Sequence, residues 1–220
     1  MSKKIIWSLF ALSLLVFVIY LSERNDYYFY RAKHYIMPAG SMLPTLEVGD
    51  EFLVKRIFSG FGERYVPIRG DVIVFWNEKV SADYVKRLIG LPGETVQIQD
   101  GIVFINRVAI SRTEGSAYTA RNGSYAGDSF SRFNEKLPNA VEYEILELSD
   151  SEKLDNTKEY VVPDGHLFVL GDNRDNSVDS RVLSTVGFVP IEDVKGVARH
   201  VYYSGPEKSF IWRRIGDDGH

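Results

Sequence analysis

Near its middle, the chain reads Thr95-Val96-Gln97-Ile98-Gln99-Asp100-Gly101-Ile102-Val103-Phe104-Ile105. Val and Ile, which favour strands, stand on both sides of Asp100-Gly101, a dipeptide typical of the two-residue turn in a β-hairpin. The sequence therefore predicts two antiparallel strands, 95–99 and 102–105, joined by a tight turn.

Outward from this hairpin, short apolar runs bounded by Gly or Pro continue in both directions. They predict further strands at 51–54, 72–75, 141–148 and 166–170. No stretch after the N-terminal segment shows the spacing of a long amphipathic helix. We therefore expect a mostly β protein.

The N-terminus carries a different pattern. The 17 residues from Ile5 to Leu21 are apolar apart from two serines, and two lysines precede them. This length is at the short end of a membrane span, about 17–25 residues. The alternative is a cleavable signal peptide, but the run exceeds the usual ~7–15 apolar residues and Leu21-Ser22-Glu23 offers no small-x-small cleavage site. We predict that residues 1–22 form an uncleaved transmembrane helix.

Composition divides the rest of the chain. The segment 111–160 is rich in Ser, Asn, Glu and Gly and contains one clear strand, 141–148. We interpret it as most of a second β-rich lobe, inserted in a first lobe built on an antiparallel sheet. The predicted boundaries are 1–22 (anchor), 23–33 (juxtamembrane linker), 34–93 and 163–203 (first lobe), 94–162 (inserted lobe) and 204–220 (C-terminal tail).

Composition also excludes several classes of protein. The 220 residues carry a formal net charge of -4, which does not favour nucleic acid as a partner. The chain has no cysteine, so it contains neither disulfides nor thiolate metal sites. Its four histidines are scattered and form no zinc motif.

Two residues of the first lobe suggest a reaction. Ser41 lies in Met37-Pro38-Ala39-Gly40-Ser41-Met42-Leu43-Pro44-Thr45, a constrained turn that can present the hydroxyl outward, and Lys86 lies in an apolar strand. Burial lowers the pKa of a lysine, and a neutral amine can take a proton from a serine. A turn-capping serine and a lysine whose ammonium reaches solvent are the commoner fates of such residues, so the residues alone leave both interpretations open.

Four blocks, in this order along the chain, resemble those of bacterial type I signal peptidases. They are Gly40–Thr45, Gly70–Phe75, Asp83–Glu94 and Gly171–Arg181, and with Gly187–Pro190 they span most of the chain after the anchor. Four ordered blocks are far more specific than one serine motif. The resemblance implies that Ser41 is the nucleophile and that Lys86 is the general base, which makes the first lobe the catalytic lobe.

The resemblance also implies a supporting network of polar side chains. It pairs, by position, Ser177 with the Lys86 amine, Asp179 with Arg181, and Asp172 with Arg87. The composition of 171–181 alone also allows two other interpretations, a turn exposed to solvent and a metal site built on aspartates. The arginines of this segment argue against the metal.

The chain departs from the family pattern at two places. The Ser41 backbone N–H is the expected oxyanion donor, but Ala39 stands where many members have a Ser or Thr whose hydroxyl is a second donor. Either the backbone alone suffices, or a water or another residue substitutes. The connection 182–186 is also longer than usual, and it is either a neutral loop or a change at the rim of the cleft.

Substrate is expected to bind by strand addition, with an extended peptide pairing along 35–39 and 83–85. Small pockets would admit Ala-sized side chains at alternating positions. The residues expected to form this substrate-binding region are Tyr35, Met37, Ala39, Met42, Leu46, Asp83, Tyr84 and Val85. Ordinary core packing is the alternative for each apolar member of this set.

The C-terminal tail carries Phe210 and Trp212 beside two arginines. Aromatic rings next to cations are typical of a segment that contacts the surface of a membrane. A terminal strand packed on the catalytic lobe is the alternative.

Together these observations predict a membrane-anchored serine endopeptidase that removes Ala-x-Ala-type signal peptides from exported preproteins, without cofactor or metal. The expected partners are signal peptides emerging from the translocase and the lipid bilayer. Lys and Arg are nearly balanced around the anchor, so the resemblance alone implies the location: a single-pass protein of the bacterial inner (plasma) membrane with its catalytic domain on the periplasmic side. The alternatives are a related Ser/Lys peptidase that matures a conjugation pilin or cleaves itself like a phage repressor, and a non-catalytic membrane-anchored module that binds peptides.

Overall fold

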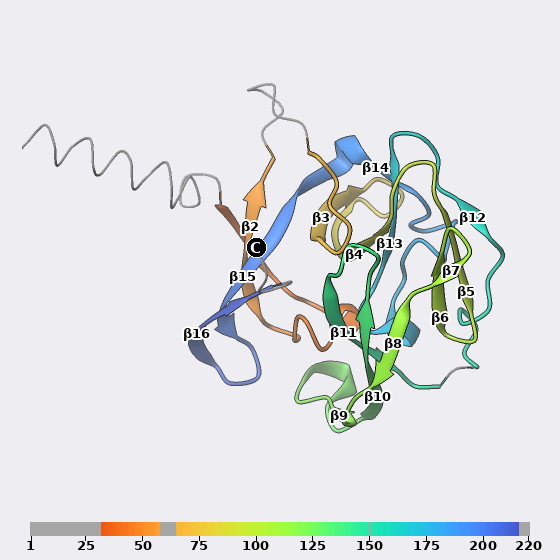
Figure 1. Cartoon of the computed structure of the whole chain (residues 1–220). Helices are drawn as coiled ribbons and strands as arrows, with labels where there is room; N and C mark the ends of the chain where they lie inside the picture. The colour runs from red at the N-terminus through yellow and green to blue at the C-terminus, as the bar shows by residue number, and fades with distance from the viewer. Residues whose placement is uncertain (1–31, 58–64, 150, 216–220) are drawn as a thin grey trace, which may run out of the picture. The chain divides into compact units, whose positions relative to one another are not determined.

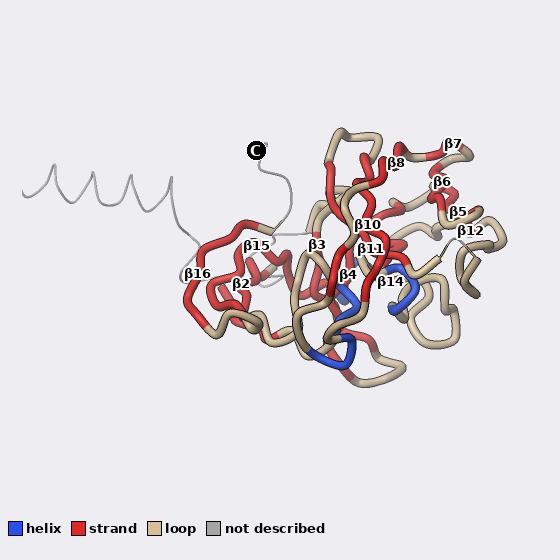
Figure 2. The backbone as a smooth tube through the Cα atoms, turned by 90° about the horizontal axis from the view of Figure 1, so that it is seen from below, coloured by secondary structure: helices blue, strands red, loops and turns tan. Residues whose placement is uncertain are grey.

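The computed structural model describes residues 32–57, 65–149 and 151–215 (Figure 1). The predicted anchor, 1–22, and the linker as far as residue 31 lie outside the described residues. Within the described ranges, no helix has the length and apolar character needed to cross a bilayer. The helices seen there are three-residue 3-10 turns, and strands dominate (Figure 2). The prediction of a mostly β protein is therefore confirmed for this part of the chain.

The largest sheet contains eight strands and runs in the order β1-β2-β15-β3-β4-β13-β14, with β16 pairing to β15. The pairs that join β2, β15, β3, β4 and β13 are all antiparallel. In Figure 1, β15 is the long strand that brings the C-terminal part of the chain between the two early strands β2 and β3. The bounds are β1 (Ala32–Ile36), β2 (Glu51–Arg56), β3 (Val72–Asn77), β4 (Ala82–Gly90), β13 (His166–Leu170), β14 (Val189–Pro190), β15 (Val194–Ser204) and β16 (Ser209–Arg214).

Two smaller sheets of four strands each come from residues 95–161, within the range that the sequence assigns to the inserted lobe. One has the order β12-β5-β6-β7, and in the other β10 pairs with β11, β8 and β9. Their strands are β5 (Thr95–Gln99), β6 (Ile102–Ile105), β7 (Val108–Ala109), β8 (Ser111–Glu114), β9 (Tyr118–Thr119), β10 (Ser129–Lys136), β11 (Glu142–Glu147) and β12 (Tyr160–Val161).

The hairpin that opens the sequence argument is present with the predicted bounds. In β5 and β6, Gln99 pairs with Ile102, and both turn residues have positive φ, 48° at Asp100 and 73° at Gly101. Positive φ at both central positions defines the turn type whose twist matches that of the flanking strands. The local sequence therefore determined this element.

The segment 111–160 contains more strands than the one that its sequence predicts. The central strand β10 was missed because its buried positions do not follow a regular apolar alternation. Phe130 and Glu135 are both buried although their spacing places them on opposite faces of a regular strand, and Glu135 forms an ion pair with Arg174. A buried, paired carboxylate breaks the apolar alternation by which a strand is recognised from sequence.

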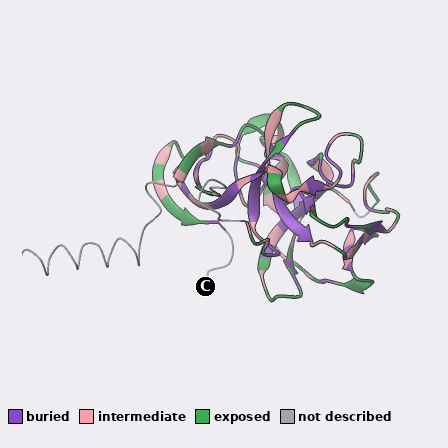
Figure 3. Cartoon of the chain, turned by 90° about the horizontal axis from the view of Figure 1, so that it is seen from above, coloured by how far each residue is buried: buried purple, intermediate pink, exposed green. Residues whose placement is uncertain are grey.

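Apolar side chains pack on both faces of the main sheet, and Figure 3 shows buried residues along several strands of the chain. Val72 and Val74 of β3 contact one cluster, and Ile73 and Phe75 contact the other. This alternation follows from the two-residue repeat of a strand. A third cluster joins Ile89 of β4 to apolar side chains of β5, β6 and β11.

The C-terminal tail contains β16, which pairs antiparallel with β15. The expectation of a terminal strand on the catalytic lobe therefore describes this segment, and Ile211 packs against the cluster of Val72 and Val74. Phe210 and Trp212 nevertheless remain 84% and 66% exposed. The strand thus has one packed face and one aromatic face in solvent.

Candidate active site

Ser41 lies in the connection between β1 and β2, within the 3-10 turn Gly40–Met42. The base of this connection is closed by main-chain hydrogen bonds, from Met37 N to Asp50 O at 2.8 Å and from Gly49 N to Met37 O at 2.7 Å. The neighbouring Met42 is fully buried. Residues 37–50, which carry the expected nucleophile and are called the nucleophile segment below, therefore form a closed, anchored loop that presents Ser41.

Lys86 reaches Ser41 from β4. Its Nζ lies 2.9 Å from Ser41 Oγ and also donates a hydrogen bond to the Val85 carbonyl oxygen at 2.9 Å. The side chain is 4% exposed, because β4 pairs with β3 at this point and the nucleophile segment covers its amine. A charged amine donates to Oγ, whereas a neutral amine can accept the Oγ proton.

The surroundings of Lys86 favour the neutral amine. Burial lowers its pKa from 10.5 to about 8, while the negative charges of Asp179 and Asp172 act in the opposite direction. Desolvation dominates because the ammonium has no carboxylate in direct contact among the described residues. At pH 8, about half of the molecules therefore carry a Lys86 amine that can accept a proton.

Asp172 connects three segments next to the dyad. Arg87 Nε and Nη2 donate to its two carboxylate oxygens at 2.8 and 2.6 Å, and the Thr45 hydroxyl donates to Oδ2 at 2.5 Å. The pair of Arg87 and Asp172 is where the sequence expected it. Thr45 was missed, although it lies in the serine block, because nothing in a local pattern shows that a hydroxyl reaches a carboxylate 127 residues away.

Asp179 and Arg181 form a second buried pair. Arg181 Nε and Nη2 each lie 2.9 Å from the carboxylate, which also accepts the Gly171 N–H at 3.1 Å. Burial alone would raise the pKa of Asp179, but the charge and hydrogen bonds of Arg181 outweigh it, so this pKa lies below its usual value. Asp179 is therefore an anion at every pH at which the enzyme would act.

Ser177 is placed differently from the expectation. Its Oγ is buried and makes no hydrogen bond to the residues that the structure describes, and the Lys86 amine bonds to Ser41 and Val85 instead. The Ser177 hydroxyl nevertheless faces Asp179 closely enough to help lower the pKa of that carboxylate. It packs tightly on Gly171, where an added Cβ would lie 2.2 Å from Oγ. Ser177 thus lies beside Asp179, and no hydrogen bond joins it to the Lys86 amine among the described residues.

A further buried pair joins β10 to the segment 171–181. Arg174 Nη1 donates to Glu135 Oε1 at 2.7 Å, and Tyr143 donates to Glu135 Oε2 at 2.6 Å. All three side chains are buried. From the sequence, Arg174 served only to argue against a metal site. Its pairing with Glu135 was not predicted. In the described residues, no group of three His, Asp or Glu side chains is arranged to hold a metal ion.

Comparisons with known proteins identify the family of this chain. The family described as "Signal peptidase, peptidase S26" matches residues 4–203. The chain belongs to this family.

Among the relatives, the signal peptidase I of Rickettsia prowazekii is 40% identical over 194 residues, which cover 77% of this chain and 71% of that protein. The signal peptidase I of Rickettsia typhi is 34% identical with the same coverage. That of Rickettsia bellii is 32% identical, with 65% of its length matched. A crystal structure of a signal peptidase I from Enterococcus faecalis is 31% identical, covers 61% of this chain and 98% of its own, and has a TM-score of 0.36.

In this member of the signal peptidase family, most residues expected to bind substrate lie together. Met37, Met42, Leu46 and Val85 belong to one apolar cluster, and Tyr35 packs against it. Tyr84 lies with the cluster on the other face of the sheet, although its ring centroid is 5.4 Å from Lys86 Nζ. Ala39 is exposed next to the nucleophile. Most of the apolar members of this set are thus buried, while a few members, such as Ala39, are accessible.

Strand β4 offers an edge beside the dyad. Strand β13 pairs with β4 only from Arg87 onward, so Asp83 to Val85 have no partner strand on that side among the described residues. Tyr35 donates a hydrogen bond to Asp83 at 3.3 Å, which links the two segments expected to hold the peptide. Lys195 pairs with the same carboxylate at 2.5 Å.

The long connection 182–186 is a compact turn rather than an extended loop. The Val182 carbonyl oxygen accepts hydrogen bonds from the N–H groups of Thr185, Val186 and Gly187. Asn77 of β3 donates to the Thr185 carbonyl oxygen at 3.0 Å. The extra residues are therefore fastened to the main sheet.

Proposed function

We propose that this protein is a membrane-anchored signal peptidase that uses Ser41 and Lys86 as a catalytic dyad. The observation that carries the proposal is the 2.9 Å contact between Ser41 Oγ and a Lys86 amine that is almost fully buried. A nucleophile in hydrogen-bond contact with a base of lowered pKa is the arrangement that activates a serine.

The reaction begins when Lys86 Nζ takes the proton of Ser41 Oγ and Oγ attacks the scissile carbonyl carbon. The Ser41 N–H donates to the oxyanion of the tetrahedral intermediate. Lys86 then gives its proton to the departing amine, which leaves an acyl ester on Ser41. Lys86 next takes a proton from a water, the hydroxide attacks the ester, and Ser41 regains its proton as the carboxylate product leaves.

The lowered pKa makes this cycle workable near neutral pH. With a pKa of about 8, about one tenth of Lys86 is neutral at pH 7. If the pKa had its ordinary value of 10.5, fewer than one molecule in about 10³ would carry a neutral Lys86 at pH 7. Burial thus raises the competent fraction by roughly 10²-fold.

The substrate would be the extended end of a signal peptide, paired along Asp83 to Val85 with small side chains, of the Ala-x-Ala type, at alternating positions. The open edge of β4 beside Lys86 supports this mode. We place the protein in the bacterial inner membrane through residues 1–22, with its catalytic domain on the periplasmic side, where preproteins emerge from the translocase. The aromatic face of β16 would contact the lipid surface.

The test is cleavage of a preprotein with an Ala-x-Ala site by the full chain in detergent. Ser41→Ala should abolish cleavage because it removes the attacking hydroxyl. Lys86→Arg should also abolish cleavage, because a guanidinium stays protonated in this pH range and cannot accept the serine proton. Exposed positions of the inserted lobe supply matched controls, Ser129→Ala and Lys136→Arg, which should cleave like the wild type. Appreciable cleavage by Lys86→Arg would rule out Lys86 as the base.

A further inference from the structure

The expected oxyanion hole of this chain lacks a side-chain donor at position 39, because Ala39 has no hydroxyl. The remaining candidate is the N–H of the peptide unit that joins Gly40 to Ser41. Ser41 is the second residue of a three-residue 3-10 turn, so its N–H has no acceptor within that turn. The orientation of this single peptide unit then decides how well the oxyanion is held.

One residue holds the main chain on both sides of Ser41. The side-chain Nδ2 of Asn173 donates to the Gly40 carbonyl oxygen at 2.9 Å, and the same oxygen accepts the Leu43 N–H at the longer distance of 3.3 Å. The main-chain N–H of the same Asn173 donates to the Ser41 carbonyl oxygen at 3.1 Å. Asn173 has no exposed surface, and Asn176 donates to its Oδ1 at 3.2 Å, which sets the orientation of the amide.

The hydrogen bond from the Asn173 side chain to Gly40 replaces the one expected from the position of Asn173 in the chain. It is the N-cap residue of the 3-10 turn Arg174–Asn176, and asparagine is a preferred N-cap because its oxygen accepts an N–H of the first turn. Its side chain makes no such cap hydrogen bond here. The amide is instead turned toward Gly40, 133 residues earlier in the chain.

The inserted lobe supports the same peptide unit. An added Cβ on Gly40 would lie 2.8 Å from Cδ2 of Tyr125, so the ring packs directly on the glycine. Tyr125 belongs to the 3-10 turn Gly123–Tyr125. The Gly40–Ser41 peptide is therefore in contact with the catalytic lobe through Asn173 and with the inserted lobe through Tyr125.

We propose that Asn173 is a positioning residue for the oxyanion hole, an inference that rests on the proposed Ser41 chemistry. A peptide unit is planar, with its C=O and N–H pointing in opposite directions. A hydrogen bond that fixes the Gly40 carbonyl therefore also fixes the direction of the Ser41 N–H. The same bond polarises the amide and strengthens its N–H as a donor, since linked hydrogen bonds reinforce one another. Asn173 thus compensates for the missing hydroxyl at Ala39.

The variants Asn173→Ala and Asn173→Leu remove the donor, and the second keeps the volume of the side chain. The matched controls are Asn77→Ala and Asn77→Leu, because Asn77 is also buried and also donates to a main-chain carbonyl, that of Thr185. Wild type and Ser41→Ala are assayed beside them. Cleavage by the wild type and none by Ser41→Ala establishes the proposed function, whatever the result at Asn173.

Both Asn173 variants should lower kcat about 10²-fold, the lower end of the effect of removing an oxyanion donor, because the N–H itself remains. KM and the apparent pKa of the pH–rate profile should not change. A peptide boronic acid, which forms a tetrahedral adduct on a serine, should lose affinity in proportion to kcat. The Asn77 variants should change none of these values.

Three results would overturn the proposal. One is an unchanged kcat in a folded Asn173 variant. Another is a loss of kcat that the unfolded fraction of the variant, measured by thermal melting, accounts for in full. The third is a shifted pH–rate profile, which would show that Asn173 acts on the Lys86 amine instead.

Discussion

Replacing Lys86 by methionine should stabilise the protein at neutral pH while abolishing its activity. The folded pKa of about 8 lies below the 10.5 of the free side chain. Between these values the unfolded chain binds more protons than the folded one, so the free energy of unfolding of the wild type rises with pH across this window. Methionine is one atom shorter than lysine, keeps most of its unbranched apolar stem and removes the titration.

The size of the effect follows from the two pKa values. A difference of 10.5 against about 8 corresponds to a penalty of roughly 3 kcal/mol at pH 7 and of about 1 kcal/mol at pH 10. The advantage of Lys86→Met over the wild type should thus shrink by about 2 kcal/mol between these pH values. The lost hydrogen bonds to Ser41 and Val85 change the absolute value, but they largely cancel in this difference.

Urea unfolding of both full-length proteins in detergent, followed by tryptophan fluorescence at pH 7, 8, 9 and 10, measures this difference directly. All other titrating groups are common to the two chains and cancel. The quantity of interest is the free energy of unfolding of Lys86→Met minus that of the wild type. If this quantity varies by less than about 1 kcal/mol across the series, or if it grows with pH, the lysine is not desolvated as proposed.

Four other expectations can be checked separately. The pH–rate profile for cleavage should rise with an apparent pKa near 8, and a profile flat from pH 6 to about 10 would contradict a lysine base. Ala39→Ser should retain or raise kcat by adding an oxyanion donor, and a large loss at unchanged stability would show that the hole lies elsewhere. Ser177→Ala should lower kcat through the environment of Asp179, and wild-type kinetics would exclude this residue from the support of the site. The chain without residues 1–22 should bind anionic vesicles with a blue shift of Trp212 fluorescence, and binding that survives Trp212→Ala would disprove contact through β16.

The sequence predicted those parts of the fold that local pattern controls. The Asp100-Gly101 turn required positive φ at both positions, and its two strands followed with the predicted bounds. The resemblance in the serine and lysine blocks indicated which side chains to examine, and the structure places them in contact.

What escaped prediction depends on contacts between distant segments. Glu135 has the appearance of a surface residue until Arg174 is placed beside it by the fold. Asn173 has the sequence position of a helix cap, and only the approach of Gly40 shows another use for its amide. Neither partner can be read from one sequence, because the chain that separates the residues of each pair carries no sign of their contact.

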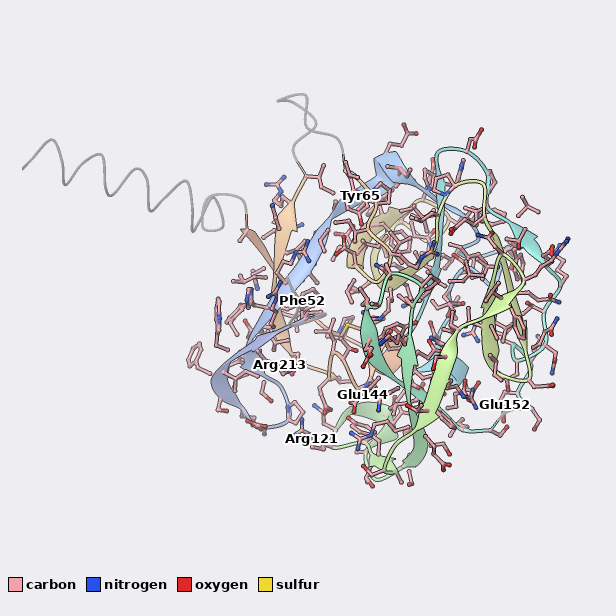
Figure 4. The ribbon with its side chains drawn as sticks, viewed as in Figure 1. Phe52, Tyr65, Arg121, Glu144, Glu152 and Arg213 are labelled. Carbon is pink, nitrogen blue, oxygen red and sulfur yellow. The ribbon has the colours of Figure 1, made fainter. Side chains whose placement is uncertain are left out.

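The nucleophile segment also determines when the chain can act during its synthesis. Several of the side chains that fasten this loop come from much later residues. Arg121 donates to Glu47, Asn173 donates to the Gly40 carbonyl oxygen, and Arg213 of β16 donates to the Thr45 carbonyl oxygen. Arg121 and Arg213 are labelled in Figure 4. Ser41 and Lys86 leave the ribosome well before these partners exist. A nascent chain that has reached only Lys86 therefore holds both members of the proposed dyad without Asn173 and Arg213, and we expect it to cleave no substrate before these residues are added.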